Sequence, residues 1–469
     1  MYKRQHLERI FRDKDVKKCV PQNAIHKRPS LLYSYLPTIR NKVLNYKAEI
    51  QNLNVDEFLS RWDENECNCV NSKFKDDHYG HIITGNLEIV ENLDLRSILK
   101  EGPNFRITPR KTNFNQLLAK LKNDVNSGVE KWSILESIPT QAFVPWKELV
   151  YKKLEQAVLK IRKSPRRTVF KSLNSYSVKT SLTDLHHKYI ITLVDKTTNN
   201  LAFICKKFYL TKLLEEVGVQ PGHKGNPTYE FVSKDDKAIL DKLKTLKIPP
   251  CRPLDNRGKD MQLPFMYLIP KMHKKPFIKF RAIVSSVNSP TKPLAKTVCH
   301  ILKQIYIKNR NYCQILKTYD GINRMWICTN YLEILSDIDH INRKYCAKSF
   351  EVFDFSTLYT KFEHDSLKEN LKWCMERAFN KKNLRISVYK TGASWVVSPR
   401  DTSYSYNIDE FILLNETLID NAYFKVGNFV FKQKIGVAMG SDPAPFQANL
   451  GLYFYEFQFQ NKYKYDSDS

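Results

Sequence analysis

Asp354 is the residue whose surroundings most directly suggest chemistry. It lies in the stretch EVFDFSTLYT, residues 351–360, at the end of an apolar and aromatic run. Phe350, Val352 and Asp354 have the same parity, so on a β-strand they would share one face that is apolar up to the carboxylate. A carboxylate where a buried strand meets a turn and a helix is a common position for a metal ligand. An ordinary acidic residue in the first turn of a helix is the alternative interpretation.

A helix is expected directly after this stretch. Asp365 and Ser366 are residue types that cap helices. The apolar residues that follow recur near helical spacing: Leu367, Leu371, Cys374 and Ala378. The carboxylate of Asp354 would therefore be presented between a strand and a helix.

A second candidate lies upstream, in YLIPKMHKKPFIKFRAIVSS at residues 267–286. Two strands joined by a turn would bring six basic side chains into one small region: Lys271, His273, Lys274, Lys275, Lys279 and Arg281. Such a hairpin is suited to holding phosphates, since a guanidinium group can bind them through two hydrogen bonds. A solvated basic hairpin without a ligand is the alternative.

The third candidate is KIGVAMGSDPAPFQANLGLYFYEFQ, residues 434–458. Two glycines and a serine precede Asp-Pro-Ala-Pro, and a helix is expected to begin within that proline-containing turn. Gly436 and Gly440 would allow the backbone to approach a ligand or a base pair closely. A glycine-rich loop before a helix is weak evidence when it is taken alone.

In this order, the segments LIPKMHK, FRAIVSS, VFDFSTLYT and AMGSDPAPFQANL resemble the reverse transcriptase domain of Penelope-like retroelements, a retrotransposon branch close to telomerase. LVDKTTNNLAFI, at residues 193–204, is similar to a strand pair of the same family. The resemblance covers about 190–455, whereas residues 1–110 match only loosely. It implies a right-hand polymerase, with fingers and part of a palm, that copies an RNA template from a DNA primer using dNTPs and magnesium.

The resemblance also implies roles for individual residues. Asp354 would be the first ligand of a two-magnesium site that activates the primer hydroxyl, and the backbone carbonyl of Phe355 could complete the ligation. Tyr359 would lie under the incoming sugar and exclude a 2′-hydroxyl. Lys271 and Arg281 would bind the triphosphate.

The remaining implied contacts are to the nucleic acid and to the nascent base pair. Lys274, Lys275 and Lys279 would contact nucleic acid, and Gly440 with Ser441 would shape the nascent pair and the template. Relatives often carry Gln directly before the Gly-Ser pair, where this chain has Met439.

The palm chemistry requires a second carboxylate site, normally an aromatic-x-Asp-Asp turn between two strands. The segment after the third motif reads NKYKYDSDS and offers Asp466 and Asp468, which alternate with serines and lack flanking apolar strands. A frayed terminus would not hold metal ligands with the required precision. We therefore expect a C-terminally truncated palm that is inactive as it stands, a catalytic site completed by another polypeptide, a nucleic-acid-binding remnant, or a product that does not fold.

The charge of the chain points to the same class of partner. Its 469 residues include 76 Lys and Arg against 49 Asp and Glu, a formal net charge of +27. Such a surplus on a globular protein favours a polyanion, and nucleic acid is preferred over an anionic membrane because a long basic amphipathic helix is not evident. No apolar run is long enough to span a bilayer, so no membrane partner is expected.

Cysteines and histidines suggest one metal site. Cys67, Cys69, His78 and His81 form C-x-C-x8-H-x2-H, the ligand types of tetrahedral zinc, although the spacing is irregular and a loop with buried thiols is the alternative. The other cysteines are scattered singly, and the N-terminus lacks the apolar core of a signal peptide. We therefore predict an intracellular protein, nuclear or cytoplasmic, and KSPRRTVFK at 163–171 could be a nuclear localisation patch or a solvated loop.

The order of the elements predicts an α+β fold with four regions. Residues 1–110 form a basic, mixed and helical N-terminal region, and 111–187 form a mostly helical connector. Residues 188–346 form a fingers-like region, in which 188–206 read as two strands joined by the turn KTTNN and 222–262 read as a linker. Residues 347–469 form the partial palm.

Overall fold

The computed structural model describes residues 43–61, 81–85, 87–100, 114–136, 139–163, 175–219, 225–253, 261–273, 279–328, 358–380, 384–396 and 404–466, with short pieces between 334 and 355. The chain divides into two compact units. The first unit comprises Met1–Asn45 and Asp76–Ile204, and the second comprises Tyr46–Lys75 and Cys205–Ser469. The domain boundaries predicted from the sequence stay predictions.

A small antiparallel sheet lies in the first unit. Its order is β1-β3-β2, formed by Ile82–Thr84, Thr197–Cys205 and Tyr189–Val194. The predicted strand pair at 188–206 is therefore present, but the predicted turn KTTNN was wrong. The chain reverses at Asp195 and Lys196, where Lys196 adopts a φ of 63°, and residues 197–200 already belong to β3. Helices α6 (Leu93–Lys100) and α9 (Tyr176–Lys188) bury Leu95, Ile98 and Leu185 in the same core as Phe203.

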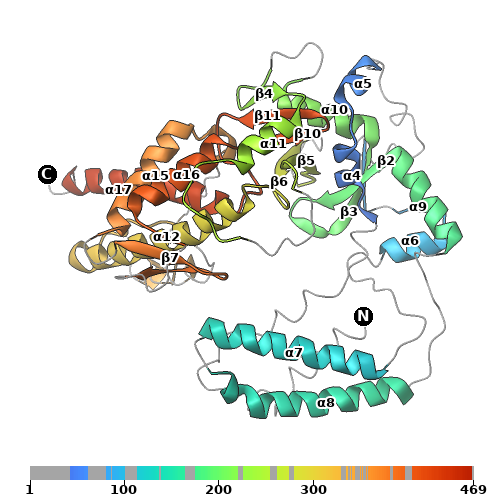
Figure 1. The fold of residues 1–469 in the computed structure, drawn as a ribbon, viewed down its shortest axis with the longest axis horizontal. Helices are drawn as coiled ribbons and strands as arrows, with labels where there is room; N and C mark the ends of the chain where they lie inside the picture. Colours follow the sequence, from blue (N-terminus) through green and yellow to red (C-terminus); the bar gives the residue numbers. More distant parts are fainter. Residues whose placement is uncertain are drawn as a thin grey trace. The chain divides into compact units, whose positions relative to one another are not determined.

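Two long helices of the first unit form a hairpin, in the region 111–187 that was predicted to be mostly helical. Helix α7 (Phe114–Glu136) and helix α8 (Val144–Lys163) are joined by the short 3-10 helix η5 (Thr140–Phe143) and lie side by side (Figure 1). Their shared core contains Val125, Val129, Phe143, Trp146, Val150 and Leu154. Because these residues recur every three or four positions, each helix buries one stripe.

A five-stranded mixed sheet organises the second unit. Its order is β4-β11-β10-β5-β6, formed by Tyr229–Ser233, Phe429–Gln433, Tyr423–Val426, Phe265–Pro270 and Phe280–Ser285. Helix α10 (Lys206–Val217) supports β5, since the hydroxyl of Tyr209 donates to the carbonyl of Leu268 and accepts from its amide at 3.1 and 2.8 Å. Helices α4 (Tyr46–Gln51) and α5 (Val55–Ser60) also belong to this unit.

The predicted linker at 222–262 was wrong for much of its length. It contains β4, which pairs with β11, and helix α11 (Asp236–Lys244), which is capped by the Asp235 side chain. Leu243 is buried against Leu263, Tyr423 and Val430. The polar and charged residues that suggested a linker are exposed on these two elements, because an edge strand and a surface helix each bury only one face.

Four helices and a small sheet form the largest core of the second unit. The helices are α12 (Lys292–Asp320), α15 (His364–Ala378), α16 (Ile408–Asp420) and α17 (Ala444–Asp466), which lie together in Figure 1. The sheet has the order β8-β7-β9, formed by Ala393–Val396, Arg385–Val388 and Ser405–Tyr406. Gly451 allows α17 to approach α15 closely, because a Cβ there would lie 2.9 Å from the Leu367 side chain of α15 and 2.8 Å from the Phe362 ring.

Two details of these helices differ from the sequence predictions. Helix α15 begins at His364, so Asp365 and Ser366 lie in its first turn and Glu363 occupies the N-cap position. The predicted buried stripe of α15 is confirmed, since Leu367, Leu371, Cys374 and Ala378 are all inside the core. The segment NKYKYD, expected in a frayed tail, belongs to α17, which extends to Asp466.

The predicted mixture of helix and sheet is confirmed, whereas its division into fingers and palm stays a prediction. Among the described residues, no helix combines the length and the apolar character needed to cross a bilayer. The intracellular location and its nuclear or cytoplasmic compartment also stay predictions.

Candidate functional site

Three segments that the sequence singled out meet at one loop, residues 434–443, which joins β11 to α17. The amide of Val284 in β6 donates to the carbonyl of Met439 at 2.7 Å. On the other side, the amide of Val437 donates to the carbonyl of Tyr359 at 2.7 Å, and Tyr359 lies in the single turn α14 (Leu358–Lys361). The amide of Gly436 donates to the carbonyl of Phe362 at the same distance. The hairpin strand, the Leu-Tyr-Thr turn and the glycine-rich loop are thus joined by backbone hydrogen bonds.

Gly436 and Gly440 are required for this junction. Their φ angles are +85° and +105°, a region that residues with a Cβ rarely adopt. A Cβ at Gly436 would lie 2.2 Å from the Tyr359 carbonyl oxygen, and a Cβ at Gly440 would lie 2.3 Å from the Val284 carbonyl oxygen. Each glycine therefore allows the loop to touch one of the two other segments. The approach to a ligand or a base pair predicted for these glycines stays a prediction, and in the structure both glycines approach the backbone of the protein.

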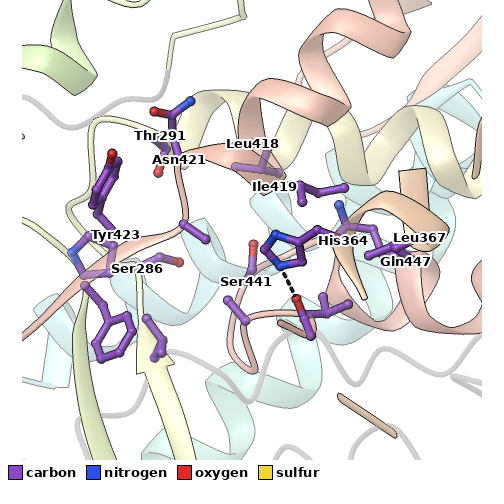
Figure 2. A pocket seen from close by; sticks show the side chains of 17 residues that line it. Ser286, Thr291, His364, Leu367, Leu418, Ile419, Asn421, Tyr423, Ser441 and Gln447 are labelled. Atoms are coloured by element: carbon purple, nitrogen blue, oxygen red, sulfur yellow. Dashed lines mark hydrogen bonds between the residues drawn. The ribbon is translucent and has the colours of Figure 1, made fainter. Parts of the chain in front are cut away.

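His364, which the sequence analysis missed, holds the same loop. Its Nε2 lies 2.8 Å from the carbonyl oxygen of Gly436, and because a carbonyl only accepts, this nitrogen carries the hydrogen (Figure 2). Burial lowers the pKa of His364, and Lys368 and Lys432 lower it further, while the Gly436 carbonyl and Asp420 act in the opposite direction. The imidazole is therefore neutral at pH 7.

A small cavity of about 60 Å³ lies behind the loop. Figure 2 shows His364 and Ser441 pointing toward one another in this cavity. The polar side chains that line it are Ser286, Thr291, His364, Asn421, Ser441 and Gln447. Gln447 donates to Asn415 at 3.1 Å, so this wall of the cavity is fixed by α16 and α17. The cavity is too small for a nucleotide. We interpret the residues around it as the packing that supports the loop.

An ion pair ties the loop to α12. The Nζ of Lys292 lies 2.7 Å from Oδ2 of Asp442, and both side chains are more than two-thirds buried, with 16% and 28% of their surfaces exposed. Lys292 also donates to the hydroxyl of Ser286 at 3.4 Å. A half-buried pair of this kind is harder to break than an exposed one, since neither charge is fully hydrated when alone.

The predicted basic hairpin exists, and β5 pairs with β6 in the register that places Ile269 opposite Arg281. The amide of Lys271 donates to the carbonyl of Lys279 at 2.8 Å, which extends the pairing beyond the strands. Lys271 is also close to Glu216: burial raises the pKa of that carboxyl, and the Tyr229 hydroxyl and the charge of Lys271 lower it. Lys274 and Lys275 lie outside the described residues.

A hollow of about 330 Å³ involves Phe355, the residue that follows Asp354 in the sequence. It is lined by Phe355, Leu358, Lys361, Phe362, Glu363, Ser366 and Tyr455. The side chain of Phe355 is 65% exposed, which is unusual for a residue of this size. Asp354 itself lies outside the described residues, so its predicted role as a magnesium ligand stays a prediction.

The other predicted ligands fall mostly outside the described part of the chain. Cys67, Cys69, His78 and Asp468 lie outside it, and the side chain of Asp466 is not described. His81 is half-buried at the start of β1. Within the described residues, no group of three His, Cys, Asp or Glu side chains is arranged to hold a metal ion. Zinc binding therefore stays a prediction.

No protein-family model and no curated protein matches this chain. Among solved structures, it is similar to apo telomerase from Candida tropicalis truncated from its C-terminal domain, at 15% identity and a TM-score of 0.42, over 98% of this chain and 76% of that one. It is also similar to telomerase from Candida albicans in complex with a TWJ fragment of telomeric RNA, at 14% identity and a TM-score of 0.39, over 98% and 68%. At identities and TM-scores this low, the likeness does not by itself establish a shared fold or function.

Proposed function

We propose that this chain is a nucleic-acid polymerase of the reverse transcriptase type, and that loop 434–443 with its two partner segments forms its site. The observation that carries the proposal is the junction itself. Three motifs far apart in the sequence resemble reverse transcriptase motifs in the same order, and backbone hydrogen bonds join them around one loop. Motifs that matched by chance would have no reason to meet in space.

Each residue then has a role in nucleotide addition. Arg281 and Lys271 bind the triphosphate from the β5–β6 hairpin, with Lys274, Lys275 and Lys279 on nearby nucleic acid. Gly440 and Ser441 present loop backbone to the nascent base pair, and Tyr359 excludes a ribose 2′-hydroxyl. Asp354, with the Phe355 carbonyl, would hold magnesium, which would supply charge neutralisation and activation of the primer hydroxyl.

The substrates follow from the same resemblance. We infer an RNA template, a DNA primer and dNTPs, and within the reverse transcriptases we favour the Penelope-like branch. The formal charge of +27 supports a polyanionic partner without choosing between RNA and DNA.

Primer extension on an RNA template tests the proposal. The proposal departs from the inactivity expected from the sequence and requires that Asp466, Asp468 or another carboxylate supply the second metal site. On that condition, purified chain, magnesium and dNTPs should extend a labelled DNA primer, and Asp354→Asn should abolish extension because it removes the charge that would hold the metal. Asp365→Asn is the matched control, since Asp365 is a nearby acid in the first turn of α15 and should be dispensable.

Retained extension by Asp354→Asn would contradict the assignment of the metal ligand. Absence of extension by the unaltered chain, with RNA still bound in a salt-dependent manner, would replace the proposed polymerase by a nucleic-acid-binding function.

A further inference from the structure

One face of α12 carries a row of basic side chains. Lys292, Lys296, His300 and Lys303 are separated by four, four and three residues, so they share one stripe of the helix. The opposite face is in the core, with Leu294, Val298, Ile301, Leu302 and Ile305 buried. The orientation of the stripe is therefore fixed by the packing of α12 and cannot rotate away from solvent.

Two lysines of this stripe have no acidic partner among the described residues, whereas Lys292 is paired with Asp442. Lys296 and Lys303 are exposed, and neither pairs with a carboxylate among the described residues. Many other lysines of the unit do form ion pairs: Lys206, Lys212, Lys234, Lys244, Lys368, Lys425 and Lys434. Asp320 at the far end of α12 is paired with Arg324 at 2.6 Å.

The positive charges of the stripe affect the pKa of the histidine within it. Burial lowers the pKa of His300, and the charges of Lys296 and Lys303 lower it further. Asp442 opposes this shift, but its carboxylate already faces Lys292. Two ammonium groups without an ion pair to a described carboxylate thus lie near a half-buried imidazole, an arrangement suited to an anionic ligand.

The stripe begins beside the proposed site, and this position suggests the direction in which a bound strand would run. It begins at Lys292, which is bound to Asp442 of loop 434–443. From Lys292 to Lys303 the helix rises about 16 Å, and from Lys296 to Lys303 about 10 Å. The second span equals the axial rise of about three phosphates on one strand of a duplex. A strand lying along α12 would therefore run to the loop.

We propose that the Lys296–Lys303 face of α12 binds the phosphate backbone of the nucleic acid that enters loop 434–443. This inference rests on the proposed function for the direction of the strand, but the binding itself requires no catalysis. The contacts are to phosphates, so the face should contribute affinity without sequence preference.

Fluorescence anisotropy of a labelled RNA–DNA hybrid, without dNTPs, tests the proposal. Lys296→Glu/Lys303→Glu should weaken binding roughly tenfold and reduce the slope of log affinity against log salt by about 2 between about 50 and 200 mM salt. Lys237→Glu/Lys247→Glu makes the same charge change at and after α11, on exposed lysines, and should change the slope by less than about 0.5. Unchanged thermal melting would show that all variants fold.

Equal losses in the two double variants would overturn the proposal, since general charge would then explain binding. A loss of binding to phosphatidylserine vesicles, with hybrid binding intact, would also overturn it by assigning the face to a membrane. Absence of primer extension together with an α12-specific loss of binding would leave this proposal standing and remove the polymerase. Normal extension without an α12-specific loss of binding would overturn this proposal and leave the polymerase standing.

Discussion

Loop 434–443 and the basic face of α12 are neighbours joined by the Lys292–Asp442 ion pair, yet they are built in opposite ways. The loop is held by backbone hydrogen bonds to β6 and to the Tyr359–Phe362 segment, and glycines make those contacts possible. The backbone hydrogen bonds of α12 are made within the helix itself, and its Lys296–Lys303 face carries charged side chains. Changes in the loop should therefore act through geometry and stability, and changes on the helix should act through charge and ionic strength.

The largest effect on stability should come from a Cβ in the loop. We expect Gly436→Ala to lower the free energy of unfolding by about 2–5 kcal/mol, because a left-handed φ and a clash with the Tyr359 carbonyl add together. Gly321→Ala is the matched control, since Gly321 has a φ of +76° but open space around it, and should cost only about 1–2 kcal/mol. Urea unfolding of both variants measures the difference, and equal costs would remove the steric role of the junction.

The next effect should come from the imidazole that holds the loop. His364→Leu leaves the buried Gly436 carbonyl without its donor and should cost about 1–3 kcal/mol. His364→Gln places an amide N–H near the same position and should restore most of the loss. A glutamine variant as unstable as the leucine variant would show that the hydrogen bond is unimportant and that only the shape of the imidazole matters.

The same residue gives a pH prediction. Burial lowers the folded-state pKa of His364 below its ordinary value of 6.5, so the unfolded chain binds the proton more readily. Its contribution to stability is complete above pH 6.5 and is lost as pH falls from there toward the folded-state pKa. Because the pKa of His300 is also lowered, we expect part of the slope of unfolding free energy against pH to disappear in His364→Gln. Identical slopes in the two proteins would contradict the shift.

A smaller effect should come from the ion pair that joins the two regions. A double-mutant cycle with Lys292→Met and Asp442→Asn should give a coupling energy of about 1 kcal/mol. The more exposed helical pair Lys244–Asp241, treated in the same way, should give about 0.3–0.5 kcal/mol. If the two couplings are equal, burial adds nothing to the pair at the loop.

The smallest effect on stability should come from the helix face. Lys296→Glu/Lys303→Glu should change the free energy of unfolding by less than about 0.5 kcal/mol, because both side chains are exposed and make no ion pair with a described residue. Thermal unfolding measures this directly. A large loss of stability would mean that the lysines serve the fold, and the contrast between the two regions would disappear.

Much of this architecture follows from local patterns in the sequence. In the α7 and α8 helices, the β5 and β6 strands and the buried stripe of α15, the regular spacing of apolar residues lies within one short stretch of sequence. The start of α17 after Pro443 follows from proline at a helix N-terminus. These features depend on neighbouring residues, so a single sequence is enough to predict them.

The features that were missed depend on partners far away in the chain. His364 is 72 residues from the carbonyl it binds, and no pattern in the neighbouring sequence indicates that contact. Strand β4 and helix α11 were hidden because their exposed residues resemble a linker, and only pairing with β11 and burial of Leu243 reveal them. The positions of Gly436 and Gly440 were predicted, but the carbonyls they approach were not.

The most direct test of the central claim, that the junction at loop 434–443 is a site of nucleotide addition, is the rate of RNA-templated primer extension by Gly440→Ala beside Gly321→Ala. Both should be assayed at a temperature where circular dichroism shows them folded. Because a displacement of about 1 Å at a reacting site can cost about 100-fold in rate, we expect a loss of that order for Gly440→Ala and a nearly unchanged rate for Gly321→Ala. Equal rates for the two variants, or no extension by the unaltered chain, would contradict the claim.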